Sequence, residues 1–294
     1  MSGLGVDQAE ALLDAVQAGI GSVDPVLEAH EVFAQMREVH AQAGDQLLDR
    51  CEATRHVGHV RAQGVDLFIE AARIARMASE GGASALLVFP PAPFTLGQSP
   101  EMALAHFKRV ADASDLPIIV FQYPLATGQG YPRDTLLKMC EQVPTIRAIK
   151  DWAGNVPQHE MHIRVLQSLP RPVNVLTTHS AWLFSSLVLG GNGLLSGSGS
   201  VIADLQSQLF AAVQANDLAA ARALNDRIYP LARVFYADPW ADMHNRMKEA
   251  LVLLGRLPRA VVRPPLVKLG RAEIERIREA LVDSGLLGAK ADAA

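Results

Sequence analysis

Short apolar segments recur roughly every 30 residues between residues 83 and 200, and this rhythm limits the folds that the chain can adopt. Each segment is rich in valine, isoleucine or leucine and is followed by turn residues, as buried parallel strands are. Helical stretches lie between them, and Ser99 before Pro100 and Pro132 before Arg133 mark two helix starts. One strand and one helix per repeat predicts a parallel sheet with helical crossovers, and this many repeats favour a closed TIM barrel over an open sheet. The expected strands are residues 85–89, 118–121, 146–150, 173–177 and 193–196.

A dinucleotide-binding Rossmann fold is the main alternative, and it would place a glycine-rich turn after its first strand. The segment Gly197-Ser198-Gly199-Ser200 follows a late strand instead. It is succeeded by Val201 rather than by the third glycine of the dinucleotide motif. We therefore interpret the segment as a tight turn between strand and helix, which could also receive an anion.

The pattern changes at both ends of the repeating region. Beyond residue 215 it is helical only, which predicts a C-terminal helical extension over residues 216–294. Residues 1–215 are assigned to an α/β barrel, but residues 1–60 are divergent and contain no convincing first strand. We therefore expect an incomplete or altered first βα unit. The extension is expected to form helices near residues 218–235, 245–251 and 271–283, the first with an apolar face of Leu218, Leu224, Ile228, Leu231 and Phe235.

Composition and charge are typical of a globular cytoplasmic protein. Hydrophobic residues make up 49% of the chain and charged residues 20%, a balance that supplies a large core and excludes wholesale disorder. A net charge of −4 gives no electrostatic reason to expect a nucleic-acid partner. Cys51 and Cys140 are too few for a disulfide framework, which favours a reducing compartment. No apolar run reaches the roughly 18–20 residues of a membrane span, and the N-terminus lacks the pattern of a secretory signal.

Lys150 is the first candidate catalytic residue. The period of two in a strand places Ile146, Ala148 and Lys150 on one face, with the lysine at the C-terminal end, where barrel enzymes build their active sites. A lysine held there loses hydration, which lowers its pKa. A neutral amine near pH 7 can attack a ketone and form a Schiff base. The alternative is a structural ion pair with Asp151 or with another carboxylate at the barrel mouth.

The segment from Gly82 to about Pro265 resembles the dihydrodipicolinate synthase / N-acetylneuraminate lyase family of class I aldolases. Its motifs occur in the family's order and spacing. They are residues 86–91, similar to the family's strand-four motif; residues 115–124, similar to the segment that ends tyrosine-asparagine-valine-proline; Thr127-Gly128; Ile149-Lys150-Asp151 with Gly154-Asn155, similar to the Schiff-base lysine segment; Lys248–Leu251 with Gly255; and Arg263–Leu266.

The resemblance implies an eight-stranded (β/α)8 barrel with a C-terminal helical extension, usually assembled as a homotetramer. It also implies a Schiff base between Lys150 and pyruvate or another 2-keto acid, without a cofactor. Phe121 and Thr127 correspond to motif positions at which the family contacts its substrate. The expected partners are therefore a small 2-keto acid and further copies of the chain.

Three departures from the family pattern affect the expected chemistry. The family's catalytic tyrosine falls on Phe121, which has no hydroxyl, and Tyr123 could either substitute for it or pack. The arginine that precedes threonine-glycine in the synthases falls on Ala126, which removes a fork for a second carboxylate and makes dihydrodipicolinate synthesis itself doubtful. The carboxylate-binding glycine-threonine-threonine-glycine-glutamate loop is missing: its nearest match, residues 28–34, contains no glycine or threonine, and His30 is the candidate substrate contact there.

Other polar residues are expected around the barrel mouth. His179 follows the strand at 173–177 on the same face and is a candidate acid or base. Ser196 and Gly197 end the next strand, where a hydroxyl and backbone N–H groups could receive a carboxylate. The pairs His56/His59 and His159/His162 have spacings that could suggest a metal, but neither has a cysteine or carboxylate in a strong pattern, so no metal is expected. Trp152 is expected to pack the mouth or to bind a sugar.

These observations favour a Schiff-base lyase, an aldolase or dehydratase, that acts on 2-keto acids through Lys150. The second hypothesis is a non-catalytic barrel that binds a keto or sugar acid or serves in assembly, which Phe121, Ala126 and the missing threonine loop favour. A third, a metal-dependent aldolase, would use the histidine pairs.

Overall fold

The structure is a computed structural model that describes residues 67–288, and the fold is given for this part of the chain. The predictions for residues 1–60, including His30, Cys51 and the pair His56/His59, lie outside the described residues.

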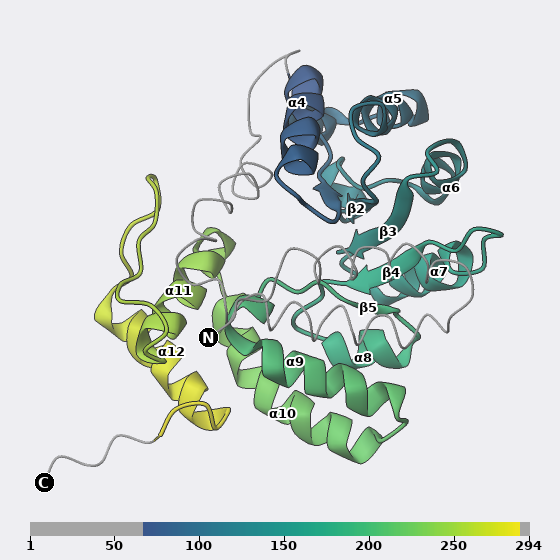
Figure 1. Ribbon diagram of the computed structural model, residues 1–294. Coiled ribbons are helices and arrows are strands. Elements are labelled where there is room, and N and C mark those ends of the chain that lie inside the picture. The colour runs from purple at the N-terminus through teal and green to yellow at the C-terminus, as the bar shows by residue number, and fades with distance from the viewer. Residues whose placement is uncertain (1–66, 289–294) are drawn as a thin grey trace, which may run out of the picture. The chain divides into compact units, whose positions relative to one another are not determined.

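Five parallel strands form one sheet in the order β1-β2-β3-β4-β5 (Figure 1). Their registers place Phe121 of β2 opposite Lys150 of β3, and Lys150 opposite Leu176 of β4. Neighbours in the chain are thus neighbours in the sheet, as in a TIM barrel, and the predicted strands are confirmed. The strands are β1 Leu86–Val88, β2 Ile118–Gln122, β3 Ile146–Asp151, β4 Asn174–Thr177 and β5 Gly193–Leu194.

Helices connect the strands, and their first turns follow the predicted signals. The Ser99 side chain accepts a hydrogen bond from the Met102 backbone N–H at 3.2 Å, and the Asn155 side chain caps the next-but-one helix in the same way. Pro132 directly precedes another helix, as predicted. These helices are α4 Leu67–Glu80, α5 Pro100–Ala111, α6 Arg133–Gln142, α7 Val156–Leu166, α8 Leu183–Val188 and α9 Gly199–Gln214.

The predicted C-terminal helices are present as α10 Leu218–Phe235, α11 Met243–Leu253 and α12 Arg271–Asp283. Ile228, Leu231 and Phe235 lie on the buried face of α10, but Leu218 is 43% exposed, so the predicted apolar face is wrong at its first position. Leu218 lies in the first turn, ahead of the buried positions that begin at Ala221.

Two hydrophobic clusters stabilise these elements. One joins β1–β4 to the helices α4–α7, and the other joins α8, β5 and α9 to the helices of the extension. The extension therefore shares its core with the last described repeats, and the predicted division at residue 215 falls between α9 and α10. Within residues 67–288, none of the helices combines the length and the apolar composition that a membrane span requires.

Candidate active site

A cavity of about 830 Å³ opens at the C-terminal ends of strands β1 to β4. The strand ends contribute Phe89, Phe121, Lys150 and His179, and the C-terminal extension closes the wall with further side chains. The cavity occupies the end of the sheet where barrel enzymes carry their active sites. The side chains from the extension are Tyr236, Trp240, Met243 and His244.

Lys150 lies in the wall of this cavity, with Nζ 5.1 Å from the centroid of the Phe121 ring. Burial lowers the pKa of Lys150 to about 8, because the hydrocarbon and aromatic surroundings solvate its ammonium group poorly. Within the described residues, no carboxylate lies at ion-pair distance from Nζ. The alternative of an ion pair with Asp151 is therefore wrong, because successive residues of a strand point to opposite faces of the sheet.

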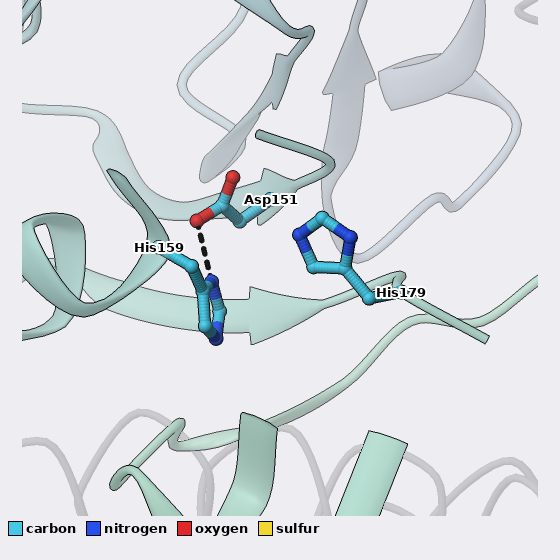
Figure 2. A group of neighbouring side chains, drawn as sticks. All are labelled: Asp151, His159 and His179. Atoms are coloured by element: carbon cyan, nitrogen blue, oxygen red, sulfur yellow. Dashed lines mark hydrogen bonds and ion pairs between the residues drawn. The ribbon is translucent and has the colours of Figure 1, made fainter. Parts of the chain in front are cut away.

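Asp151 is fully buried behind the sheet, where three donors surround its carboxylate. Oδ2 accepts hydrogen bonds from Nδ1 of His159 at 2.7 Å and Nδ1 of His162 at 2.8 Å, both on α7 (Figure 2). Oδ1 accepts one from the backbone N–H of Ala153 at 2.9 Å. These bonds lower the pKa of Asp151 far below its ordinary value, although burial acts in the opposite direction. The network ties the end of β3, where Lys150 lies, to α7.

Asp151 and His159 also belong, together with His179, to a group that has the residue types of a metal site. Asp151, His159 and His179 each offer one ligand atom, and these atoms lie within 4.8 Å of one another (Figure 2). The interpretation that His159 and His162 lack a carboxylate partner is thus wrong, because the fold brings β3 against α7. However, the Ser186 hydroxyl lies 2.5 Å from Nε2 of His159, so one neutral tautomer satisfies both ring nitrogens. We therefore interpret Asp151 and His159, with His162, as a hydrogen-bonded support, since a cation would have to displace the Nδ1 proton of His159.

His179 lines the cavity, as predicted from its place after β4. Its ring stacks on Trp182 with a centroid separation of 3.9 Å, and burial lowers the pKa of His179 to about 4. The imidazole is therefore neutral at pH 7, so it can accept a proton but is a poor acid there. Nε2 is buried and has no hydrogen-bond partner in the described part of the chain.

The remaining predicted residues are distributed unevenly around the cavity. Phe121 and Tyr123 both line it, with ring centroids 4.6 Å apart, and Gly197 lines it at the end of β5. Ser196 is not part of the lining; its hydroxyl is hydrogen-bonded to the Ser180 hydroxyl at 2.6 Å. Thr127 is also absent from the lining: it is exposed, and its hydroxyl donates to the Pro124 carbonyl at 2.7 Å. The structure thus brings Lys150, His179, Phe121, Tyr123 and Gly197 to one cavity.

Sequence reasoning missed the contribution of the C-terminal extension. Trp240 stacks on Trp152 with a centroid separation of 5.3 Å, and Tyr236 accepts a hydrogen bond from the Ser198 backbone N–H at 3.1 Å. The buried Arg246 guanidinium holds this segment by donating to the carbonyl of Ala237 at 2.6 Å and to those of its neighbours. A local signal for this contribution was available in the sequence. Residues 235–240, at the junction between the two predicted helices, contain a proline and three aromatic residues.

The fold and the site of this protein have the features of the TIM-barrel Schiff-base lyases. These features are barrel strands, an amine of lowered pKa at one strand end, and a cavity beside that amine. A model of the "Dihydrodipicolinate synthetase family" matches residues 56–283. The chain therefore belongs to the dihydrodipicolinate synthase family and is a class I aldolase or lyase.

Curated relatives agree with this assignment, and solved structures share the fold. The 4-hydroxy-tetrahydrodipicolinate synthase of Chlorobium phaeobacteroides (strain BS1) is 28% identical over 92% of this chain and 85% of that protein. The protein of the same name from Moorella thermoacetica (strain ATCC 39073 / JCM 9320) is 29% identical over 92% and 86%. The prophage protein YagE of E. coli K12, solved in complex with pyruvate, is 24% identical, with a TM-score of 0.70 over 81% of each chain. A monomeric dihydrodipicolinate synthase variant gives 0.69 at 23% identity, over 75% of this chain and 71% of the other.

Proposed function

We propose that the protein is a Schiff-base lyase that acts on pyruvate or another 2-keto acid through Lys150. The observation that carries this proposal is the position of Nζ in the cavity, with a pKa lowered to about 8. About a tenth of the lysine is then neutral at pH 7, a far larger fraction than for an exposed lysine. The solved E. coli relative in complex with pyruvate supports the same class of ligand.

The chemistry begins when the Lys150 amine attacks the keto carbon and water leaves. The resulting iminium withdraws electrons from the neighbouring carbon, so that a C–C bond is made or broken there, or water is lost in a dehydratase. We assign proton transfer to Tyr123 and His179, which line the cavity with Lys150, because Phe121 carries no hydroxyl. Gly197, with Ser196 behind it, is the candidate receiver of the keto acid carboxylate, and Phe121 is the apolar contact. Thr127 and His30 remain the weaker substrate-contact candidates.

We further propose that this chain is not a true 4-hydroxy-tetrahydrodipicolinate synthase, although its relatives bear that name. Ala126 stands where the resemblance expects an arginine, and it is exposed outside the cavity lining. Phe121 and Ala126 also favour the second candidate, a barrel that binds a keto acid without turnover. Assembly as a homodimer or homotetramer in the cytoplasm is the accompanying expectation.

Borohydride trapping tests the proposed function directly. Incubation with pyruvate and sodium borohydride should add the reduced pyruvate adduct to Lys150, and mass spectrometry of peptides should locate it there. Lys108 provides the matched control, because this lysine lies on the outer helix α5 and bonds Gln142 at 3.1 Å. An adduct that persists in the Lys150→Ala variant, or no adduct across a panel of 2-keto acids, would contradict the proposal.

The rate of Schiff-base formation should rise with pH and level off above a midpoint near 8. The neutral amine is the nucleophile, and burial lowers the pKa of Lys150 to about 8 from its ordinary value of 10.5. Trapping rates measured at constant pyruvate between pH 6 and 10 give this midpoint. A rate that still increases proportionally with hydroxide above pH 9 would mean that the amine is fully hydrated.

A further inference from the structure

A continuous series of aromatic side chains forms one wall of the cavity. Centroid separations along the series are 4.5 Å for Phe89–Phe121, 4.6 Å for Phe121–Tyr123, 5.5 Å for Tyr123–Trp152 and 5.3 Å for Trp152–Trp240. All five residues line the cavity, and they come from three strand ends and the C-terminal extension. We name them the aromatic wall. Lys150 lies against its middle, because Nζ is 5.1 Å from the Phe121 centroid.

The aromatic wall leaves an apolar surface open to a ligand. Trp240 is 43% exposed although it stacks on Trp152, so its outer part retains water that an apolar group would displace. The segment that carries Trp240 is held by Arg246, whose guanidinium donates to the carbonyls of Ala237, Asp238 and Pro239. This surface is therefore pre-formed, which reduces the entropy lost on binding.

The charges of the described lining residues disfavour a second acidic group on the substrate. Among the described lining residues, Lys150 is the only lysine or arginine, and none is acidic. Burial lowers the pKa of the lining histidines His106 and His179 to about 4. The pKa of the third, His244, is also lowered, by burial and by the nearby Lys150 and Lys248, so the described lining histidines favour the neutral form at pH 7. Once Lys150 has formed its Schiff base with the keto carbon, a carboxylate at the far end of the substrate would be buried without a partner, which is costly.

The volume of the cavity is also larger than pyruvate alone requires. Sites of about 300–1,000 Å³ hold ligands the size of drug molecules, and this cavity has about 830 Å³. A sugar acid has several hydroxyl groups that would each need a hydrogen-bond partner, and along the aromatic wall only the Tyr123 hydroxyl and the two indole N–H groups could supply one. An aromatic ring requires none of these partners and gains from stacking.

We propose that the substrate, given the Schiff-base function proposed above, is a 2-keto acid that carries an aromatic ring beyond its third carbon. In the cleavage direction Lys150 condenses with the C2 carbonyl of a 4-aryl-4-hydroxy-2-oxobutanoate and water leaves. His179 takes the C4 hydroxyl proton and the C3–C4 bond breaks, so that an aromatic aldehyde departs. The electron pair of the broken bond moves towards the iminium and forms the enamine. A proton returns to C3, and water hydrolyses the iminium to give pyruvate and free Lys150. The aryl group stacks on Trp152 and Trp240.

The test compares three aldehydes in the condensation direction with pyruvate: benzaldehyde, D-glyceraldehyde and succinic semialdehyde. We expect kcat/KM to be at least about tenfold higher for benzaldehyde than for either of the others. Trp152→Leu and Trp240→Leu should each reduce this preference about threefold to tenfold, whereas Trp240→Phe should keep most of it. The matched control is Tyr229→Leu, because Tyr229 is an exposed aromatic residue of α10 outside the cavity lining.

The outcomes distinguish failure of the aromatic substrate from failure of the Schiff-base function. A protein that forms the pyruvate adduct on Lys150 but prefers glyceraldehyde or succinic semialdehyde overturns the aromatic substrate and leaves the Schiff-base function standing. A preference for benzaldehyde that both tryptophan variants retain shows that the aromatic wall does not provide it, which also overturns the inference. A protein that forms no adduct overturns both proposals.

Discussion

Lys150→Met is expected to abolish pyruvate trapping and to reduce lyase activity by at least about a thousandfold, while making the protein more stable at pH 7. The activity falls because methionine has no amine to form the iminium. The stability rises because a lysine whose folded pKa is about 8 favours the unfolded state, where the ammonium is hydrated and the pKa is ordinary. The apolar methionine fits among the same neighbours without this cost.

The expected gain in the free energy of unfolding is about 1–3 kcal/mol, which is less than the full pKa shift would give because Lys150 is only partly buried.

The sign of this stability change can be checked by its dependence on pH. The cost of burying the ammonium is fully present below pH 8 and disappears as the pH rises towards 10.5, so the two proteins should converge at alkaline pH. Urea unfolding at pH 7 and pH 10 measures this. Lys138→Met, at a surface pair with Glu101, is the control and should change stability by less than about 0.5 kcal/mol. A variant less stable than the parent at pH 7 would contradict this account.

Asp151→Asn is expected to lower the free energy of unfolding by about 3–5 kcal/mol at pH 7. In the parent protein Oδ2 accepts two imidazole N–H groups, and Oδ1 accepts the backbone N–H of Ala153. An asparagine places an amide NH2 opposite one set of these donors, so at least one buried donor loses its partner and the charge-assisted bonds are lost. The melting temperature should fall by roughly 6–15 °C.

The pH dependence of this difference has a definite sign. The pKa of Asp151 is lowered in the folded state, so its contribution is present above about pH 4 and is lost as the pH falls. Parent and variant should therefore differ most near pH 7 and less well below pH 4, which thermal unfolding at pH 7 and at about pH 2 can measure. Asp134→Asn is the matched control, because the Asp134 carboxylate is exposed on α6. An Asp151→Asn protein as stable as this control would mean that the two histidines do not depend on the carboxylate.

The sequence alone predicted the features that depend on local patterns. Strand periodicity located β1 to β5, and the serine before Pro100 located the start of α5. The position of Lys150 at a strand end, together with the surrounding motifs, predicted both the barrel and the candidate nucleophile. Alternation along a strand and capping at a helix start depend on residues a few positions apart, so they can be read from one chain.

Only the tertiary structure decided which distant residues meet. It brings His159 and His162 of α7 to Asp151 and stacks Trp240 of the extension on Trp152, and it leaves Thr127 exposed outside the cavity. These contacts depend on how a helix packs against a sheet and on how the extension returns to the strand ends, and no short-range pattern specifies either. The sequence therefore determined that an amine would stand at the end of β3, whereas the packing of remote elements determined its hydration, its support and the shape of the cavity beside it.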